Sequence, residues 1–220
     1  MGSAGGDAMT QAKERPILFS APMVRAILEG RKTVTRREVK VQPRSSADIG
    51  SFGRGQPFIR HPDVTKANPE CPYGRPGDRL WVREAWQADA QVNEVAPREL
   101  SHGEPIRYPA DGASRQTGCS MITLGKTRPS IHMPRWVSRI LLEITDVRVE
   151  RLQAITYEEA AAEGVHRDSA CRMWTATDEG GTCHKYPVPA FRDLWSGING
   201  AENWNANPWV WVVEFKRVTP

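Results

Sequence analysis

The hydrophobic positions of this chain repeat with the two-residue period of a β-strand in several places. β-Branched and aromatic residues dominate these stretches, and such residues favour the pleated, half-buried surface of a strand. In the stretch 79–86, strict alternation would place Glu84 on the face opposite Trp81 and Arg83. The predicted strands are 17–19, 33–41, 79–86, 136–152 and 208–218, with a shorter one near 106–108.

Three other stretches carry helix signals. Ser20 is a favourable N-cap for a helix that ends at Gly30, because glycine readily adopts the left-handed conformation of a helix end. The segment 156–159 reads Thr-Tyr-Glu-Glu, a capping box, and it predicts a short helix that stops at Gly164. Apolar residues at helical spacing predict a third helix over 189–198.

Long polar connections rich in proline, glycine and serine separate these elements. They lie near 42–75, 87–130 and 166–186, and they are predicted to be irregular insertions. The small, aperiodic residues 1–14 are predicted to be a disordered tail, so that one domain would span 15–220. Several strands, few helices and long connections predict an α+β, mainly β fold: a closed or half-closed mixed β-barrel with short helices.

Composition restricts the class of protein further. The chain has 220 residues, of which 39% are apolar and 25% are charged, as in a globular domain. It has neither an apolar run long enough to span a bilayer nor the apolar core of a signal peptide, so we expect no membrane partner and a cytoplasmic location. The four cysteines form no C-x-x-C pair and fit no standard zinc spacing, so we expect no disulfide framework, metal or cofactor. The sequence does not predict an oligomeric state.

Charge is distributed unevenly. The net charge is +4, but residues 25–60 contain nine basic and three acidic residues, a bias that suits a polyanion or a nucleotide. Eight tryptophans is a high count, and one or two of them are candidates for stacking on a base. The candidate residues for substrate or nucleic-acid binding are Arg31, Arg36, Arg37, Arg44, Trp81, Arg83 and Glu84.

The stretch 30–37 holds the residues with the clearest catalytic chemistry. Neighbouring arginines disfavour the protonated amine of Lys32, and a lysine that loses its proton near neutral pH is a general base. The hydroxyl of Thr35 is then a candidate nucleophile. Strict alternation would send the two side chains to opposite faces, so they meet only if Lys32 belongs to the preceding turn or a bulge intervenes. Without any chemistry, the same residues describe a helix end followed by an exposed basic strand.

An acidic residue is placed to complete this group. Glu163 falls at the end of the helix that stops at Gly164, where the helix dipole disfavours a carboxylate. A buried carboxylate at that position would need a cationic partner such as Lys32.

Four motifs in this order resemble the ASCH domain, a member of the PUA-like superfamily of small β-barrels that handle RNA or modified nucleosides. They are G-R-K-T-V-T-R at 30–36, G-D-R-L-W-V at 77–82, the helix segment 152–164 and the closing strand V-V-E-F at 212–215. The longer pattern, with R-P-I-L-F-S at 15–20 and I-H-M-P-R-W at 131–136, is similar to ASCH-like proteins of tailed bacteriophages and prophages. A phage origin would imply the cytoplasm of a bacterial host.

The threonine form of the first motif resembles small bacterial ASCH amidohydrolases that remove the acyl group from N4-acetylcytidine. This resemblance implies Lys32 as base, Thr35 as nucleophile and Glu163 as proton relay, acting on a nucleoside or modified base without a cofactor. The alternative is a non-catalytic module that uses the basic 25–60 region to bind RNA or a modified nucleic acid. Its partner would then be RNA or DNA. A nuclease that uses the same residues is the third hypothesis.

Overall fold

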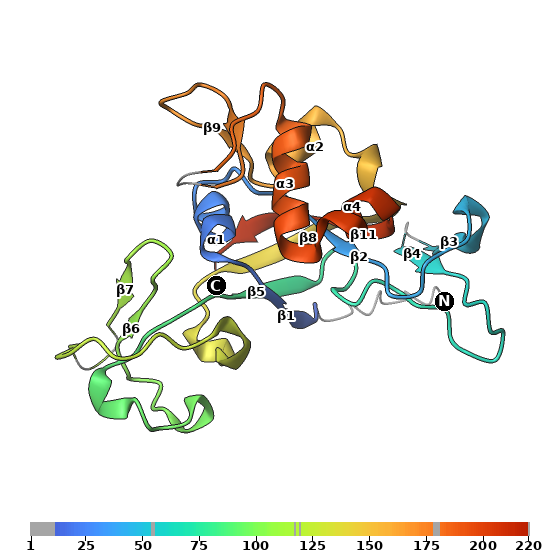
Figure 1. Ribbon diagram of the computed structural model, residues 1–220. Coiled ribbons are helices and arrows are strands. Elements are labelled where there is room, and N and C mark those ends of the chain that lie inside the picture. The colour runs from blue at the N-terminus through green and yellow to red at the C-terminus, as the bar shows by residue number, and fades with distance from the viewer. Residues whose placement is uncertain (1–11, 54–55, 117, 119, 178–180, 220) are drawn as a thin grey trace, which may run out of the picture.

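A mixed five-stranded sheet forms the centre of the molecule, which is known here from a computed structural model (Figure 1). In spatial order its strands are β1 (Glu14–Leu18), β5 (Arg79–Arg83), β8 (Leu141–Arg151), β11 (Trp209–Val218) and β2 (Val34–Glu38). The pair β1 and β5 is parallel, and all other neighbours are antiparallel. The structure describes residues 12–53, 56–116, 118, 120–177 and 181–219.

The five main predicted strands are present, with shifted ends. β1 begins at Glu14 and pairs with β5, and the backbone N–H of Lys13 donates to Asp78. The predicted disordered tail 1–14 therefore includes two residues, Lys13 and Glu14, that are ordered. Residues 1–11 of that tail lie outside the described residues. β8 starts only at Leu141, because Arg135–Val137 forms a 3-10 turn.

Among the described residues the sheet does not close, so the predicted alternative of a closed barrel is wrong. The α+β class, with more strands than helices, is confirmed. The edge strands β1 and β2 are not paired with each other in the described chain, although the Arg37 side chain of β2 donates to the Leu18 carbonyl at 2.8 Å. Two features of β1 oppose closure: Pro16 has no backbone donor, and helix α1 (Ala21–Leu28) begins three residues after the strand ends.

Both faces of the sheet are covered by apolar side chains. In β11, Trp209, Trp211, Val213 and Phe215 enter the main core beneath α1, whereas Val210 and Val212 enter a second core on the opposite face. This burial on both faces explains why the sequence of the strand is almost continuously apolar. As predicted, the terminal strand lies inside the sheet, between β8 and β2.

The second core is closed by α2 (Tyr157–Ala162), α3 (Pro187–Asn199) and α4 (Ala201–Ala206), which lie above the sheet in Figure 1. Helix α3 was predicted, but Ile198 on its expected apolar face is 57% exposed. The sequence did not predict α4, which follows Gly200 at a φ of +90°. None of the described helices combines the length and apolar composition needed to cross a membrane.

The three insertions contain more regular structure than expected. The segment predicted as a loop over 42–75 holds a hairpin of β3 (Ile49–Phe52) and β4 (Gln56–Ile59), in which Phe52 stacks on Phe58. The second insertion holds β6 (Ile106–Arg107), which confirms the short strand predicted near 106–108, paired with β7 (Ser114–Arg115). The third holds β9 (His166–Arg167) paired with β10 (Trp174–Thr175). Short 3-10 turns lie at Ser46–Asp48, Ala90–Val92, Pro97–Glu99, Ser130–His132 and Leu152–Ala154.

The long excursion after β5 packs around a small core of its own. Trp86, Ile106, Tyr108 and Met133 are fully buried there, and the Tyr108 hydroxyl donates to the Val137 carbonyl at 2.7 Å. Figure 1 shows this part as the green and yellow lobe at the lower left, beneath the sheet. It therefore lies on the side away from helices α2 to α4.

Candidate active site

The chain leaves α1 through a tight turn that determines where Lys32 lies. The Gly30 N–H donates to Ile27 at 3.1 Å and the Arg31 N–H donates to Ala26 at 2.8 Å, the two bonds of a Schellman helix end. Gly30 has a φ of +75°, as predicted from its sequence position. Lys32 thus belongs to the turn before β2, the condition under which the sequence allowed it to approach Thr35.

Residues 31–33 also supply hydrogen-bond donors to the carbonyl groups at the C-terminal end of α2. The Arg31 guanidinium donates to the Gly164 carbonyl at 2.8 Å, the Lys32 amine to the Glu163 carbonyl at 2.9 Å, and the Thr33 N–H to the Ala162 carbonyl at 2.9 Å. Unpaired carbonyls at a helix end are satisfied by such donors, and positive charge is favourable there. Part of the basic motif therefore has a structural role at the junction of α1, α2 and β2.

Lys32 and Glu163 form a buried ion pair, as expected if the carboxylate lay inside the protein. Lys32 is 2% exposed and Glu163 is 3% exposed, and Nζ lies 2.7 Å from Oε2. The amine also donates to the Val34 carbonyl at 2.8 Å, so its three N–H donors are all used. Burial lowers the pKa of Lys32; the Glu163 carboxylate opposes this, and Arg37 and Arg36 lower the pKa further.

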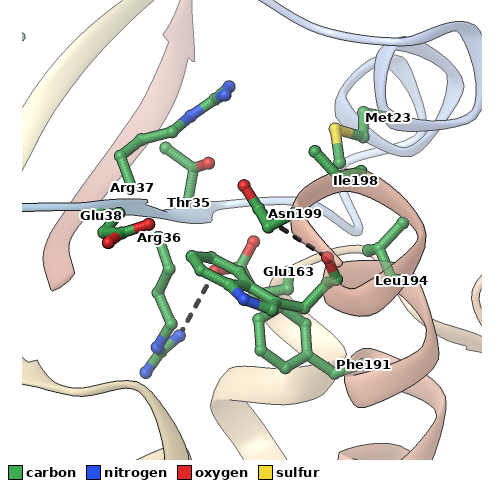
Figure 2. A pocket seen from close by; sticks show the side chains of 11 residues that line it. Met23, Thr35, Arg36, Arg37, Glu38, Glu163, Phe191, Leu194, Ile198 and Asn199 are labelled. Atoms are coloured by element: carbon green, nitrogen blue, oxygen red, sulfur yellow. Dashed lines mark hydrogen bonds and ion pairs between the residues drawn. The ribbon is translucent and has the colours of Figure 1, made fainter. Parts of the chain in front are cut away.

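Thr35 reaches a pocket from the opposite side of the strand to Arg36. In the pairing with β11, Thr35 lies opposite Val213 and Arg36 opposite Val212, so their side chains point to different faces of the sheet (Figure 2). The pocket, of about 60 Å³, is lined by both Thr35 and Glu163. The Thr35 hydroxyl makes no hydrogen bond to any described residue. We expected the Lys32 amine to reach this hydroxyl directly or through one water, and the amine makes no direct bond to it.

Arg36 connects the pair to a larger ionic network. Its fully buried guanidinium contacts Glu163 at 3.4 Å and Glu159 at 2.8 Å. Glu159 also accepts from Arg148, which contacts Asp146, Glu150 and Glu214 as well. Burial alone would raise the pKa of Glu159, but the Thr156 backbone N–H and the two arginines hold it below its ordinary value. The Glu163 carboxylate is therefore shared between Lys32 and Arg36.

The predicted arginines lie in different settings rather than along one groove. Arg37 lines the Thr35 pocket, and its guanidinium lies 5.5 Å from the Phe19 ring centroid. Arg31 pairs with Glu29 at 2.6 Å and lines a smaller neighbouring pocket. Arg44 has an 81% exposed side chain and contacts Asp48 at 3.4 Å. These positions give little support to a continuous basic surface for nucleic acid.

The candidates in β5 lie away from this pocket. Trp81 is buried, its backbone pairs with Pro16 of β1 and Leu141 of β8, and the Arg83 guanidinium lies 4.8 Å from its ring centroid. Glu84 is buried in a separate ion pair with Arg139. None of the three lines the Thr35 pocket. The assignment of side chains to two faces follows the strand as predicted, but the prediction of a half-buried strand is wrong at Trp81, which is buried like Leu80 and Val82 on the other face.

The sequence missed the wall of the pocket that faces β2. Helices α1 and α3 supply it, and Figure 2 shows Met23, Leu194, Ile198 and Asn199 opposite Thr35. Leu194 and Ile198 also line an adjoining cavity of about 250 Å³, whose other wall is formed by residues 175–177, 181 and 182 of the third insertion. Pockets that hold drug-sized ligands measure roughly 300–1,000 Å³, so a nucleoside would have to occupy both spaces. The amphipathic pattern of 189–198 was the only signal in the sequence for this wall.

No metal site is formed by three or more His, Cys, Asp or Glu side chains in the part of the chain that the structure describes. The polar groups that line the pocket are hydroxyl, carboxylate, carboxamide, indole and guanidinium groups. Comparison with known proteins gives no matching family model, no similar curated protein and no similar solved structure. The chemistry of the site is therefore judged from its geometry.

Proposed function

We propose that this chain is an amidohydrolase that removes an acyl group from the N4 amine of an acylated cytosine base or nucleoside. The observation that carries the proposal is the meeting of Thr35 and Glu163 in one pocket, with the Lys32 amine 2.7 Å behind the carboxylate. A hydroxyl beside a carboxylate and a lysine of lowered pKa has the composition of an activated nucleophile. The resemblance of residues 30–36 to the ASCH motif supports the same assignment.

In the proposed reaction, the Thr35 oxygen attacks the acyl carbonyl. Its proton passes through the Glu163 carboxylate to Lys32, and then to the leaving amine of cytosine. Water hydrolyses the resulting acyl-threonine ester, which releases the carboxylic acid and restores the hydroxyl. To accept a proton, Lys32 must be neutral and must give up one of the three hydrogen bonds that its ammonium form donates.

Two arginine nitrogens could stabilise the oxyanion of this reaction. Both Arg36 and Arg37 line the pocket, and the buried Nε of each has no hydrogen-bond partner among the described residues. An unpaired buried donor costs about 1–3 kcal/mol, and a substrate oxygen would remove that penalty. Such donors contribute most when they face the charge that develops in the transition state.

Turnover of N4-acetylcytidine to cytidine tests the proposal, with a matched pair of threonine variants. Thr35→Ala should lower kcat/KM by at least about a hundredfold, because the nucleophile is lost. Thr33→Ala is the control: Thr33 is exposed two residues earlier, and its backbone contacts to α2 remain. Equal activity of the two variants, or no turnover by the wild-type protein, would reject the assignment.

Lys32 requires a test that separates catalysis from its structural bonds. If Lys32 is the base, kcat/KM rises with pH as the amine loses its proton, and Lys32→Arg is inactive because a guanidinium stays protonated. Rates should be normalised to the folded fraction, measured by circular dichroism. A folded Lys32→Ala protein with wild-type kcat/KM would leave Lys32 with only its role at the end of α2.

Nucleic-acid binding remains the alternative to hydrolysis. It predicts an affinity for RNA that falls steeply with salt, because phosphate contacts release counterions. The triple variant Arg36→Ser, Arg37→Ser, Arg44→Ser should then lose binding. Arg44→Ser alone is the sharper variant, since Arg36 and Arg37 also support the fold.

A further inference from the structure

Two cysteines of the insertion 166–186 face each other. The Sγ atoms of Cys171 and Cys183 lie 2.7 Å apart although both thiols are free and the residues are twelve positions apart. Two non-bonded sulfur atoms do not normally approach so closely, and the distance is nearer to the roughly 2.05 Å of a disulfide bond. Cys171 is exposed and Cys183 is half-buried, so solvent reaches the pair.

The backbone holds both residues in place without a covalent bond between them. The Cys171 N–H donates to the Asp168 carboxylate at 2.9 Å, inside a tight turn in which Arg172 has a φ of +57°. On the other side, His184 exchanges two backbone hydrogen bonds of 2.7 and 2.8 Å with Trp174 of β10. The His184 ring also contacts the Asp193 carboxylate of α3 at 2.6 Å. Because His184 directly follows Cys183, these contacts hold the backbone at Cys183 in place.

We propose that Cys171 and Cys183 are an oxidative modification site, and that they form an intrachain disulfide by exchange with a small disulfide such as oxidised glutathione. The exposed Cys171 thiolate attacks one glutathione sulfur and releases one glutathione thiolate. The Cys183 thiolate then attacks the Cys171 sulfur, and the second glutathione leaves. Two cysteine thiols are oxidised, one glutathione disulfide is reduced to two thiols, and the two cysteine protons pass to them.

The Cys171 thiol favours the protonated form of Cys183. Hydrogen bonding to Cys171 raises the pKa of Cys183 to about 11, which disfavours the Cys183 thiolate at neutral pH. The order of attack above follows from the greater exposure of Cys171. Cys71 provides an internal comparison, because it is buried and burial raises its pKa to about 11.

The disulfide would close the segment that forms one wall of the larger cavity. Thr175, Ala176 and Thr177 line that cavity, and they lie within the loop between the two cysteines. Oxidation would therefore link the two ends of the segment that contains this wall. This inference stands on the sulfur geometry and is independent of the proposed hydrolase activity.

The test uses the full chain equilibrated with glutathione from fully reduced to fully oxidised, then alkylated and digested with trypsin without reduction. Cleavage after Arg167, Arg172 and Lys185 gives the peptides 168–172 and 173–185, each with one of the two cysteines. The oxidised sample should contain these peptides as one disulfide-linked species, which separates on reduction. In the reduced sample both should be alkylated.

Two variants make the result specific. In Cys171→Ser the linked species should vanish, and Cys183 should carry glutathione or remain a thiol. Cys119→Ser removes a cysteine that belongs to neither peptide, and it should leave the linked species unchanged. The proposal is overturned if the linked species is absent at every ratio, or if either cysteine pairs mainly with Cys119 or Cys71.

Discussion

Glu163 and Glu84 are two carboxylates buried to nearly the same degree, 3% and 1% exposed, and each is paired with a basic side chain. Glu163 lies at the junction of α1, α2 and β2, whereas Glu84 lies just beyond β5, beside the lobe at 87–137. Their surroundings differ in one respect that matters for function. The Glu163 carboxylate lines a pocket together with a threonine hydroxyl that has no partner in the described chain.

The pair at Glu84 is closed. Arg139 donates to both Glu84 oxygens, at 2.9 and 3.0 Å, and to both Asp111 oxygens, at 2.8 and 3.0 Å. The Tyr108 ring covers the guanidinium at 4.0 Å. Each of these three charged groups has a partner, so the arrangement is what a buried ionic link between the sheet and the lobe requires.

The comparison shows that burial of an ion pair is not by itself a sign of catalysis. Both pairs join residues that are distant in the sequence. In each pair burial shifts the pKa of one member, downward for Lys32 and upward for Glu84. What distinguishes the Lys32–Glu163 pair is access to a pocket, together with the free hydroxyl of Thr35. Three sets of variants test whether this distinction is one of stability, of backbone geometry or of titration.

Removal of a cation should have the largest effect. Lys32→Met leaves Glu163 buried with only the 3.4 Å contact to Arg36, and it should lower the free energy of unfolding by about 3–5 kcal/mol, measured by urea denaturation. Arg139→Met should act in the same direction by leaving Glu84 unpaired. The double variant Lys32→Met, Glu163→Gln should recover part of the loss, and the exposed Lys40→Met should change stability by less than about 0.5 kcal/mol. A loss below 1 kcal/mol in Lys32→Met would contradict a desolvated pair.

A backbone change should give an intermediate effect at the first junction. Gly164 has a φ of +105°, and a Cβ there would lie 3.1 Å from Ala26 Cβ and 3.4 Å from Lys32 Cβ. Gly164→Ala should therefore lower the free energy of unfolding by about 1–3 kcal/mol. Gly197→Ala is the matched control, since its Cβ would meet nothing within 4 Å and its helical backbone favours alanine. Equal effects of the two substitutions would show that this approach of α1 to α2 is not tightly packed.

Titration in acid should give the smallest effect, with opposite signs in the two regions. Burial raises the pKa of Glu84 above its ordinary 4.5 despite Arg139, so the folded state takes up a proton first and the contribution of Glu84 to stability increases as pH falls through that window. The pKa of Glu159 is below its ordinary 4.5, so its contribution is lost as pH falls below that value. Unfolding free energies of Glu84→Gln and Glu159→Gln between pH 7 and pH 3 should therefore diverge from the wild type in opposite directions. Parallel curves would contradict the difference between the two regions.

The features predicted correctly from the sequence are those whose determinants lie within a few residues. The helix end at Gly30 depends on one left-handed residue and two local hydrogen bonds, and the capping box joins Thr156 to Glu159 three residues later. The alternation in β5 and the apolar run of β11 follow in the same way from side-chain period and burial. These signals established the α+β class and the turn position of Lys32.

Contacts between distant segments decided the rest. Whether β1 and β2 would close a barrel depended on edge strands nearly twenty residues apart, and a proline and a helix kept the sheet open. That Trp81 is buried could not be read from the run 79–86, because an alternating pattern does not show what lies over the second face of a strand. The sequence by itself determined that Lys32 follows a helix end and that Glu163 ends another helix. Only the tertiary structure brought them within 2.7 Å across 131 positions, because a buried carboxylate at a helix end is stable only beside a donor.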